Sequence, residues 1–341
     1  MGTVIELSEL RDAAQKAFPA DQLIPPRDDS WKLVAEMGWL MIDLPEARGG
    51  LGLGRDATAA LCFELGRVLA TAPLAPALLA LRGIAHAEGF AQRDSWIERI
   101  CGGDYVPLNM LPGTVERKSD GRLDGRISGV FEADMADHVL AGLAGIHVLI
   151  PLDAPGVTVR ERAIWDRSRR LFDIDLAGFT PDASLIVAEG EDATRLHDHV
   201  SPLAQLAIVA DSLGGANAAL EMTVEYLKMR KQFDRPLAMF QALKHRCADL
   251  RTIVSAAEAL LWSRARDESA TITDLGALKA HASDVYRQVV EEAIQLHGGI
   301  GLTEEHQCHL FLKRAMLNLQ LCGSVDHWRE QAGRAALAAC T

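Results

Sequence analysis

The sequence lacks any paired-cysteine motif. Its 341 residues include six cysteines, but none stands in a Cys-x-x-Cys arrangement, which argues against a disulfide framework. Several of them fall on apolar helical faces, where a free thiol packs as a small hydrophobic group. This usage is typical of a reducing compartment. The cysteines are Cys62, Cys101, Cys247, Cys308, Cys322 and Cys340.

The sequence also lacks a secretory leader and a long apolar run. It starts with MGTVIELSELRD, which is mixed and acidic, whereas a leader is basic and then apolar. The longest apolar stretch, residues 138–152, covers about 15 residues and is broken by Gly142 and Gly145. That length is too short to cross a bilayer. We therefore expect a cytoplasmic protein without membrane attachment.

The sequence has no excess of basic residues either. The formal net charge is −12, which argues against nucleic-acid binding through a general basic surface. An anionic small ligand remains compatible with this charge, because it needs only a local patch of cations. Hydrophobic residues make up 49% of the chain, which is enough for two or three packed units.

What is present is a pattern in three parts. Residues 1–104 follow the helical period, residues 105–195 carry glycines, prolines and short alternating runs, and residues 196–341 return to long helical periods. The sequence thus predicts a mainly α protein with a small central β domain. The glycine-rich segment 44–54 has no strand before it, so we interpret it as a tight connection between helices and not as a phosphate loop.

Helix ends can be placed in the last part of the chain. Thr273 and Thr303 are expected N-caps, because a threonine hydroxyl can accept a hydrogen bond from a free N–H of the first turn. Gly298 is an expected helix end, since glycine adopts the left-handed conformation that closes many helices. Ser324 is expected to cap the last helix.

Segment 226–250 is the most informative part of the sequence. It predicts the end of one long helix, a turn and the start of another, because Pro236 lacks the N–H needed to continue the first helix. The turn offers cations, amides and an aromatic ring beside a helix N-terminus, which suits an anionic ligand such as a phosphate. These residues are Arg230, Lys231, Gln232, Phe233, Arg235 and Gln241.

Two motifs here resemble those of the acyl-CoA dehydrogenase family. The first is Arg230-Lys-Gln-Phe-Asp-Arg-Pro-Leu followed by Phe240-Gln241, and the second is Gln295-Leu-His-Gly-Gly-Ile-Gly-Leu-Thr-Glu-Glu-His306. The resemblance implies an N-terminal helical domain over 1–104, a middle β-barrel-like domain over 105–195 and a C-terminal four-helix bundle over 196–341. It also implies FAD, shared across a subunit interface.

In that family, the two motifs form the surface that one subunit lends to its neighbour's flavin. By this resemblance, Arg230 pairs with the pyrophosphate, Phe233 packs on the cofactor, and the glycines allow the backbone to approach the adenine end. The implied cofactor-binding residues are Arg230, Gln232, Phe233, Phe240, Gln241, Gln295, Gly298 and Gly299.

The resemblance is incomplete at two places: the strands with which a family member binds its own flavin, and the position of its catalytic base. A Thr-Glu-Pro strand has no counterpart, and Gly129 and Phe131 stand at the Trp and Thr positions of a Trp-Ile-Thr strand. The catalytic Glu falls at Cys322 or, in the alternative place, at Ala204. Neither is a carboxylate, and a cysteine base would need a lowered pKa that nothing obvious supplies. We therefore assign no catalytic residue to this chain.

These losses predict the shorter, non-catalytic subunit of a heteromeric α2β2 enzyme, similar to actinobacterial dehydrogenases of steroid side-chain thioesters. The expected partners are a longer catalytic subunit, an acyl-CoA substrate and an electron-transfer flavoprotein as acceptor. Two alternatives stay open. One is a self-sufficient homotetrameric dehydrogenase with a relocated base, and the other is a flavin-free structural subunit.

A metal site is not predicted. His297, His306, Cys308 and His309 fit no usual zinc spacing. We also expect a helix and its neighbouring loop to place them on different faces.

Overall fold

The computed structural model describes residues 6–111, 113–143 and 145–339, so Cys340 lies outside the described residues. Its contacts divide the chain into two compact units, each built from segments distant in the sequence. We call the first the helical unit; it consists of Met1–Pro25, Ala59–Ala70 and Gln205–Thr341. We call the second the sheet unit; it consists of Pro26–Thr58 and Thr71–Ala204.

The sheet unit holds two antiparallel sheets, whose strands all lie between residues 114 and 189. The first sheet has the order β1 (Thr114–Arg117), β2 (Leu123–Phe131), β6 (Leu171–Phe179) and β5 (Val157–Arg162). The second has the order β3 (His138–Leu143), β4 (Ile146–Pro151) and β7 (Ile186–Glu189). Apolar residues of both sheets form one core, which includes Ile127, Val139, Val148 and Ile174.

Helices accompany the sheets in this unit. They are α2 (Arg27–Glu36), α4 (Leu74–His86) and α5 (Arg93–Cys101), with the short 3-10 turns η1 (Trp39–Met41), η2 (Glu46–Arg48), η3 (Ala133–Met135) and η4 (Ala183–Leu185). The prediction of a mainly helical protein with a small central β domain is confirmed. The domain boundaries at residues 104 and 195 stay a prediction.

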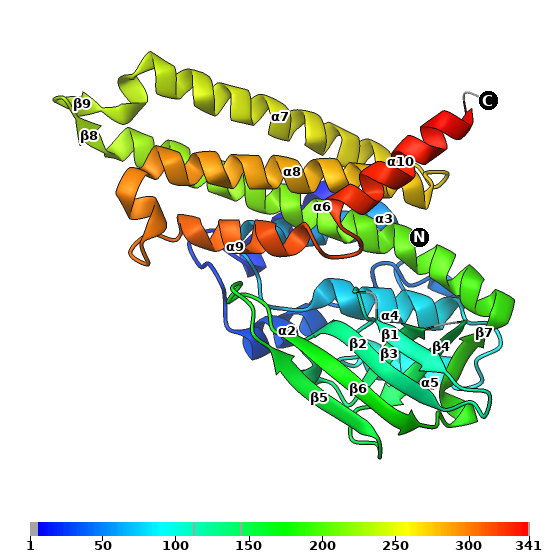
Figure 1. The fold of residues 1–341 in the computed structure, drawn as a ribbon. Coiled ribbons are helices and arrows are strands. Elements are labelled where there is room, and N and C mark those ends of the chain that lie inside the picture. The colour runs from blue at the N-terminus through cyan, green and yellow to red at the C-terminus, as the bar shows by residue number, and fades with distance from the viewer. Residues whose placement is uncertain (1–5, 112, 144, 340–341) are drawn as a thin grey trace. The chain divides into compact units, whose positions relative to one another are not determined.

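The helical unit is a bundle of long helices that run lengthwise beside one another (Figure 1). Its elements are α1 (Leu7–Ala17), α6 (Gly190–Met229) from Gln205 onward, α7 (Gln241–Arg266), α8 (Ile272–His297), α9 (Cys308–Asn318) and α10 (Val325–Ala339). The greater part of α3 (Arg55–Arg67) also belongs to it. Short elements join the helices: β8 (Lys231–Gln232), β9 (Arg235–Pro236), η5 (Leu237–Met239) and η6 (Gly298–Leu302).

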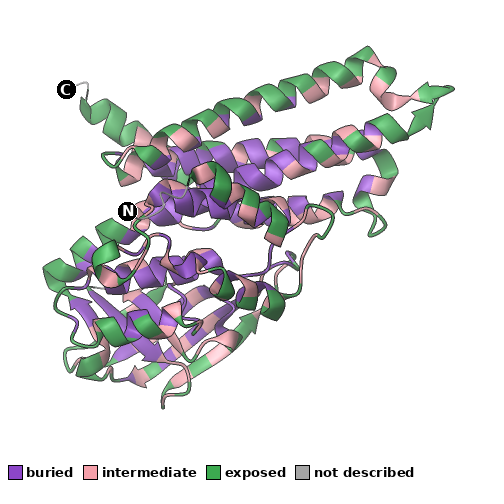
Figure 2. Cartoon of the chain, turned by 180° about the vertical axis from the view of Figure 1, so that it is seen from behind, coloured by how far each residue is buried: buried purple, intermediate pink, exposed green. Residues whose placement is uncertain are grey.

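Burial is uneven among these helices. Fourteen of the 26 residues of α8 are buried, whereas only five of the 26 residues of α7 are. Figure 2 shows this contrast, with exposed residues along α7 and at the hairpin that precedes it. Helix α7 therefore packs on the bundle by a narrow stripe and leaves most of its surface open.

Helix α6 is long and apolar enough to cross a membrane by length and composition. However, 94% of its apolar window is buried inside the structure, which is how the core helix of a folded domain behaves.

Two of the four predicted features at helix ends are wrong. Helix α8 is capped by Thr271 and not by Thr273, because Thr271 and Asp274 exchange hydrogen bonds in a capping box. Thr303 caps no helix, since its hydroxyl donates to the Ile300 carbonyl and α9 starts only at Cys308. The predicted end of α8 at Gly298 is confirmed, with φ at 66°.

The cap predicted for the last helix is also found. The Ser324 hydroxyl oxygen accepts a hydrogen bond from the His327 N–H at 3.2 Å, and α10 follows directly at Val325.

Two glycines allow α3 and α6 to approach each other closely within the helical unit. A Cβ on Gly214 would overlap the Phe63 carbonyl oxygen, and a Cβ on Gly66 would overlap the backbone of Asp211. Each helix thus contributes one glycine to the crossing, and no side chain fits at either point.

We predict that Gly214→Ala destabilises the protein, by about 1–3 kcal/mol, because the added methyl group forces the two backbones apart. Gly333→Ala in α10 is the matched control, since a Cβ there meets no atom within 4 Å. Alanine has the higher helix propensity, so the control should be neutral or stabilised by up to about 1 kcal/mol. Urea unfolding measures both, and equal stability of the two variants would contradict the packing argument.

Candidate functional site

The connection between α6 and α7 is a small hairpin followed by η5, where the sequence predicted a short turn. Strands β8 and β9 pair, and the two residues between them, Phe233 and Asp234, both have positive φ, 53° and 61°. This is the geometry of a tight two-residue hairpin. A phenylalanine rarely adopts positive φ, and here its side chain is 85% exposed. The hairpin therefore projects an aromatic ring away from the chain that carries it.

A cation stands at the base of this hairpin. The Arg230 backbone is fixed on both sides, because its N–H donates to Tyr226 and its carbonyl accepts from Leu237. Its side chain is exposed, and within residues 6–111, 113–143 and 145–339 its guanidinium has no ion-pair partner. An arginine whose charge is not neutralised by its own chain is suited to an external anion.

The start of α7 adds to this arrangement. Phe240 is the N-cap of α7 and supplies no side-chain acceptor, so the first N–H groups of the helix face outward with their partial positive charge. The Arg235 guanidinium lies 4.1 Å from the centre of the Phe240 ring, and Phe233 meets the same ring edge to face at 6.0 Å. The side chains of Gln232 and Gln241 are exposed beside them.

The second motif presents open backbone. Gly298 needs to be glycine because its φ of 66° with ψ of −146° is accessible to few other residues. Gly299 has no such need, and a Cβ on either glycine would meet no atom within 4 Å. Packing inside this chain therefore gives no reason for Gly299, whereas close approach of a ligand gives one. Gln295 is exposed one turn earlier.

One contact brings the two motifs to the same end of the bundle. The Tyr226 hydroxyl donates to the His297 carbonyl at 3.2 Å, and the two rings stack with centres 4.4 Å apart. Tyr226 lies one helical turn before Arg230, and His297 directly precedes Gly298. The exposed cation, the projecting aromatic ring and the open glycine backbone thus share one surface, which we call the hairpin surface.

Three of the four residues predicted to lie on different faces, His297, His306 and Cys308, lie together, so that prediction is wrong for them. His297 and His306 have ring centres 4.2 Å apart, and one ligand atom each of His297, His306 and Cys308 lies within 4.8 Å of the others. The reason is the fold of η6, which turns the chain back so that the start of α9 returns to the end of α8.

Cys322 lies in a loop that the bundle holds firmly. Its carbonyl accepts hydrogen bonds from the Gln205 side chain at 2.9 Å and from the Trp328 indole at 2.8 Å. The buried Lys279 ammonium donates to the carbonyls of Leu319 and Gly323, on either side of it. Burial raises the pKa of the Cys322 thiol to about 12, and the Lys279 charge opposes this only in part. Cys322 is thus a neutral thiol at physiological pH.

The residues at the predicted Trp and Thr positions are also explained by packing. Phe131 is 3% exposed, and its carbonyl accepts the Tyr105 hydroxyl at 2.9 Å. Gly129 has φ at 58°, and a Cβ there would overlap the Leu111 side chain. Neither residue presents a polar side chain to a ligand.

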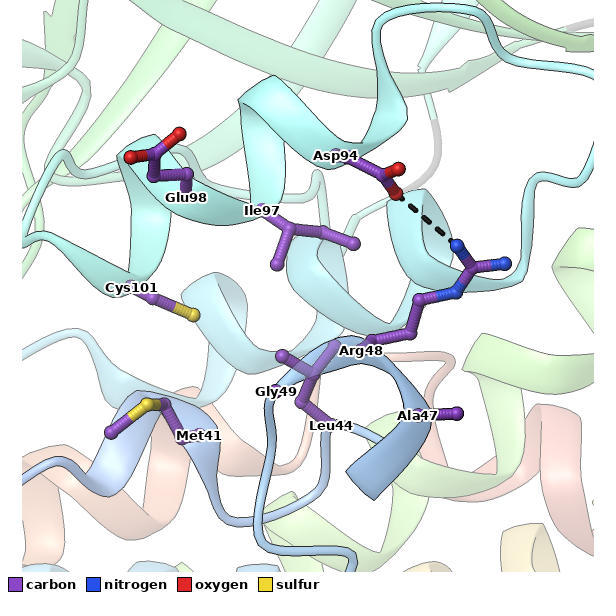
Figure 3. Close-up of a pocket in the computed structure, with 9 residues that line it drawn as sticks. All are labelled: Met41, Leu44, Ala47, Arg48, Gly49, Asp94, Ile97, Glu98 and Cys101. Carbon is purple, nitrogen blue, oxygen red and sulfur yellow. Dashed lines mark hydrogen bonds and ion pairs between the residues drawn. The ribbon is translucent and has the colours of Figure 1, made fainter.

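The glycine-rich segment 44–54 lines a pocket of about 360 Å³ in the sheet unit (Figure 3). Arg48 is the only cation among the described residues that line it, and it is paired with Asp94 at 3.2 Å. The Glu98 carboxylate lines the same pocket, which makes it unfavourable for a phosphate. A Cβ on Gly50 would overlap the Leu44 carbonyl, so the glycine serves the tight fold of the segment itself.

Comparison with known proteins gives concordant matches along the chain. The model described as acyl-CoA dehydrogenase, N-terminal domain, matches residues 7–104, and that described as acyl-CoA dehydrogenase, C-terminal domain, matches residues 203–337. The acyl-CoA dehydrogenase IpdE2 of Mycobacterium tuberculosis is 32% identical over 299 residues, which is 86% of this chain and 82% of that protein.

Solved structures match over nearly the whole chain. One is a steroid acyl-CoA dehydrogenase, the Tcur3481-Tcur3483 G363A variant, with a TM-score of 0.84 at 28% identity. The aligned region covers 98% of this chain and 99% of the matched chain. The ChsE4-ChsE5 complex from Mycobacterium tuberculosis has a TM-score of 0.81 at 23% identity and covers 99% of each chain, which shows likeness of fold.

We predict that Cys322 resists alkylation in the folded protein. A pKa near 12 in place of 9 lowers the thiolate fraction at pH 8 by about 10³-fold relative to the unfolded chain. Iodoacetamide labelling at pH 8, with and without urea and read by peptide mass spectrometry, measures the two rates. Labelling as fast in the folded protein as in urea would show an activated thiolate and reopen a catalytic role.

Proposed function

Because this chain belongs to the acyl-CoA dehydrogenase family, we propose that it is the non-catalytic subunit of a heteromeric FAD-dependent acyl-CoA dehydrogenase. In this proposal, it completes the flavin site of a longer partner subunit. The reaction is the α,β-dehydrogenation of an acyl-CoA thioester. FAD, when bound, supplies the acceptor for the hydride that leaves Cβ, and a carboxylate removes the proton at Cα.

The observation that carries the proposal is a contrast between two parts of the chain. The hairpin surface is exposed and its Arg230 charge is uncompensated among the described residues, whereas the proposed positions of the family base hold a half-buried Cys322, whose thiol is neutral, and a buried Ala204. The open surface is suited to any family member that lends it to a neighbouring subunit. The lack of a carboxylate at the proposed base positions is what favours a non-catalytic subunit.

The residues of the hairpin surface fit the polar end of FAD. The Arg230 guanidinium would pair with the pyrophosphate, and the free N–H groups at the start of α7 favour the same negative charge. The open backbone at Gly298 and Gly299 leaves space for the adenine end. Gln232, Gln241 and Gln295 add exposed amides that can donate or accept hydrogen bonds.

The apolar side chains around the hairpin also favour a partner. Phe233 is 85% exposed, and Met229 and Met239, close to it in the sequence, are exposed as well; Leu302 of η6 is 75% exposed. Burying one such side chain contributes about 1.5–3 kcal/mol, so the cluster supports association. Helix α7, with only five buried residues, offers a long face for the same contact.

The lack of a carboxylate at the two proposed base positions favours a partner that supplies the catalytic base. A thiol with a pKa near 12 is a poor acceptor of a Cα proton at physiological pH, and alanine has no acceptor at all. The Cys322 carbonyl is already engaged, because it accepts a hydrogen bond from the Gln205 amide. The catalytic carboxylate and the strands that hold the flavin ring would come from the partner.

A similar solved structure supports the class of substrate, and the family resemblance supports the kind of acceptor. The Tcur3481-Tcur3483 enzyme, at 28% identity, is a steroid acyl-CoA dehydrogenase. We propose a steroid side-chain thioester as substrate class, an electron-transfer flavoprotein as acceptor and an α2β2 assembly. The cytoplasmic location that we also propose rests on the sequence alone.

We predict that the chain produced alone is colourless, because it supplies only part of a flavin site. Tagged chain isolated from its own host should instead carry a longer acyl-CoA dehydrogenase subunit in equal amount, together with flavin absorbance. Mass spectrometry and visible spectra of the two preparations make the comparison. A yellow, active homotetramer from the chain alone would favour the self-sufficient dehydrogenase. A colourless native complex would favour the flavin-free structural subunit.

We also predict that Arg230→Ala weakens flavin retention in the native complex by about 10–100-fold, as expected for loss of a charge-assisted hydrogen bond. Arg334→Ala is the matched control, because Arg334 is exposed on α10 and pairs only with Glu330 among the described residues. Equilibrium dialysis of FAD from each complex gives the dissociation constants. Equal constants for Arg230→Ala and the unmodified complex would contradict the proposed contact.

A further inference from the structure

Two histidines and a cysteine, residue types that often bind metals, lie close together where the chain folds back after α8. His297 is the last residue of α8, His306 lies between η6 and α9, and Cys308 is the first residue of α9. One ligand atom from each lies within 4.8 Å of the others. None of the three belongs to the cofactor-binding residues assigned above, so the cluster needs its own explanation.

His297 directs an unused lone pair into this cluster. Its Nδ1 lies 2.7 Å from the Ala293 carbonyl oxygen, and because that oxygen can only accept, Nδ1 carries the proton. The Nε2 atom is then a bare acceptor. It is buried, in a residue only 3% exposed, and it has no hydrogen-bond partner among the described residues. An unmet acceptor in the interior costs stability, unless a ligand uses it.

The hydrogen bond to Ala293 is itself typical of a metal ligand. Histidine ligands commonly donate their second ring N–H to a backbone carbonyl, which fixes the tautomer and orients the free nitrogen. The ring of His297 is further held by stacking on Tyr226, whose hydroxyl reaches the His297 carbonyl. The nitrogen is therefore positioned before any ion arrives.

His306 and Cys308 supply the other donors. The Cys308 sulfur belongs to a fully buried residue, forms no disulfide and lies in the first turn of α9, where the helix dipole favours a thiolate. Burial acts in the opposite direction and raises the pKa of this thiol to about 12, so a bound cation has to displace its proton. The His306 ring is half-buried, and its Nδ1 accepts the Cys308 N–H at 3.2 Å. This bond is long, so the ring can exchange it for a metal bond with little loss.

We propose that His297, His306 and Cys308 bind one zinc-like divalent cation. Two imidazoles and a thiolate suit Zn²⁺, which binds nitrogen at about 2.0–2.1 Å and sulfur at about 2.3 Å in tetrahedral geometry. Ligand atoms in such a site lie about 3.3–3.8 Å apart, so the side chains close in by roughly 1 Å on binding. Water or a residue of another subunit takes the fourth position.

The site would fix the loop that carries Gly298 and Gly299. Residues 298–302 join two of the ligands, so a bound ion clamps both ends of η6. Metal binding is independent of the proposed flavin role, because all three ligands lie within the helical unit and are present in the chain alone.

Cobalt substitution tests the site directly. The purified full chain, with any affinity tag removed, is stripped with chelator and titrated with Co²⁺ alone. We expect one equivalent to bind, with the sulfur-to-cobalt charge-transfer band and the intense visible bands of four-coordinate cobalt, and Zn²⁺ should displace it. Tm in the presence of Zn²⁺ gives a second readout.

Cys308→Ser and His306→Asn should weaken binding at least about 100-fold and abolish the Tm increase by Zn²⁺. Cys247→Ser on α7 is the matched control, since Cys247 is a half-buried thiol outside the cluster. If Cys308→Ser does not fold, the more exposed His306→Asn decides the question. Cobalt spectra without the thiolate band, or equal binding by His306→Asn and the unmodified chain, would overturn the proposal.

Discussion

The contact between Tyr226 and His297 is the constraint on which the hairpin surface depends. It joins the end of α6 to the end of α8 through a hydrogen bond and a stacked ring pair. Without it, the arginine motif and the glycine motif would be separate features of two helices. With it, an unneutralised cation, a helix N-terminus and an open backbone meet at one end of the bundle. The same contact orients His297, whose free ring nitrogen lies in the histidine–cysteine cluster.

The residues suited to bind a dinucleotide differ in exposure from the residues at the proposed base positions. The groups suited to hold a dinucleotide lie at the surface, and Phe233 even adopts a strained backbone conformation to project its ring. At the positions proposed for the family base, Ala204 is buried and has no acceptor, and the half-buried Cys322 is a neutral thiol whose carbonyl accepts a hydrogen bond from the Gln205 side chain. A subunit that completes another subunit's site needs the first set and not the second.

The sequence predicted the fold class and the two motifs because both depend on local patterns, namely helical periodicity, Pro236 and the runs that begin at Arg230 and Gln295. It failed where several local signals compete. Thr271 and Thr273 are both plausible caps, and only the pairing of Thr271 with Asp274 decides between them. It failed again where η6 reverses the chain, because spacing alone cannot show that His297, His306 and Cys308 converge. The motif resemblance predicted an exposed Arg230 and Gly299, but not the Tyr226–His297 contact that brings the two motifs to one end of the bundle.

The stoichiometry of FAD in the native complex tests the central claim most directly. FAD released by denaturation is quantified by absorbance, and each polypeptide in the same sample is quantified by amino-acid analysis. If this chain lends its surface and holds no flavin of its own, the complex contains one FAD for each pair of unlike chains. One FAD for every chain would contradict the account, because this subunit would then build a complete site for itself.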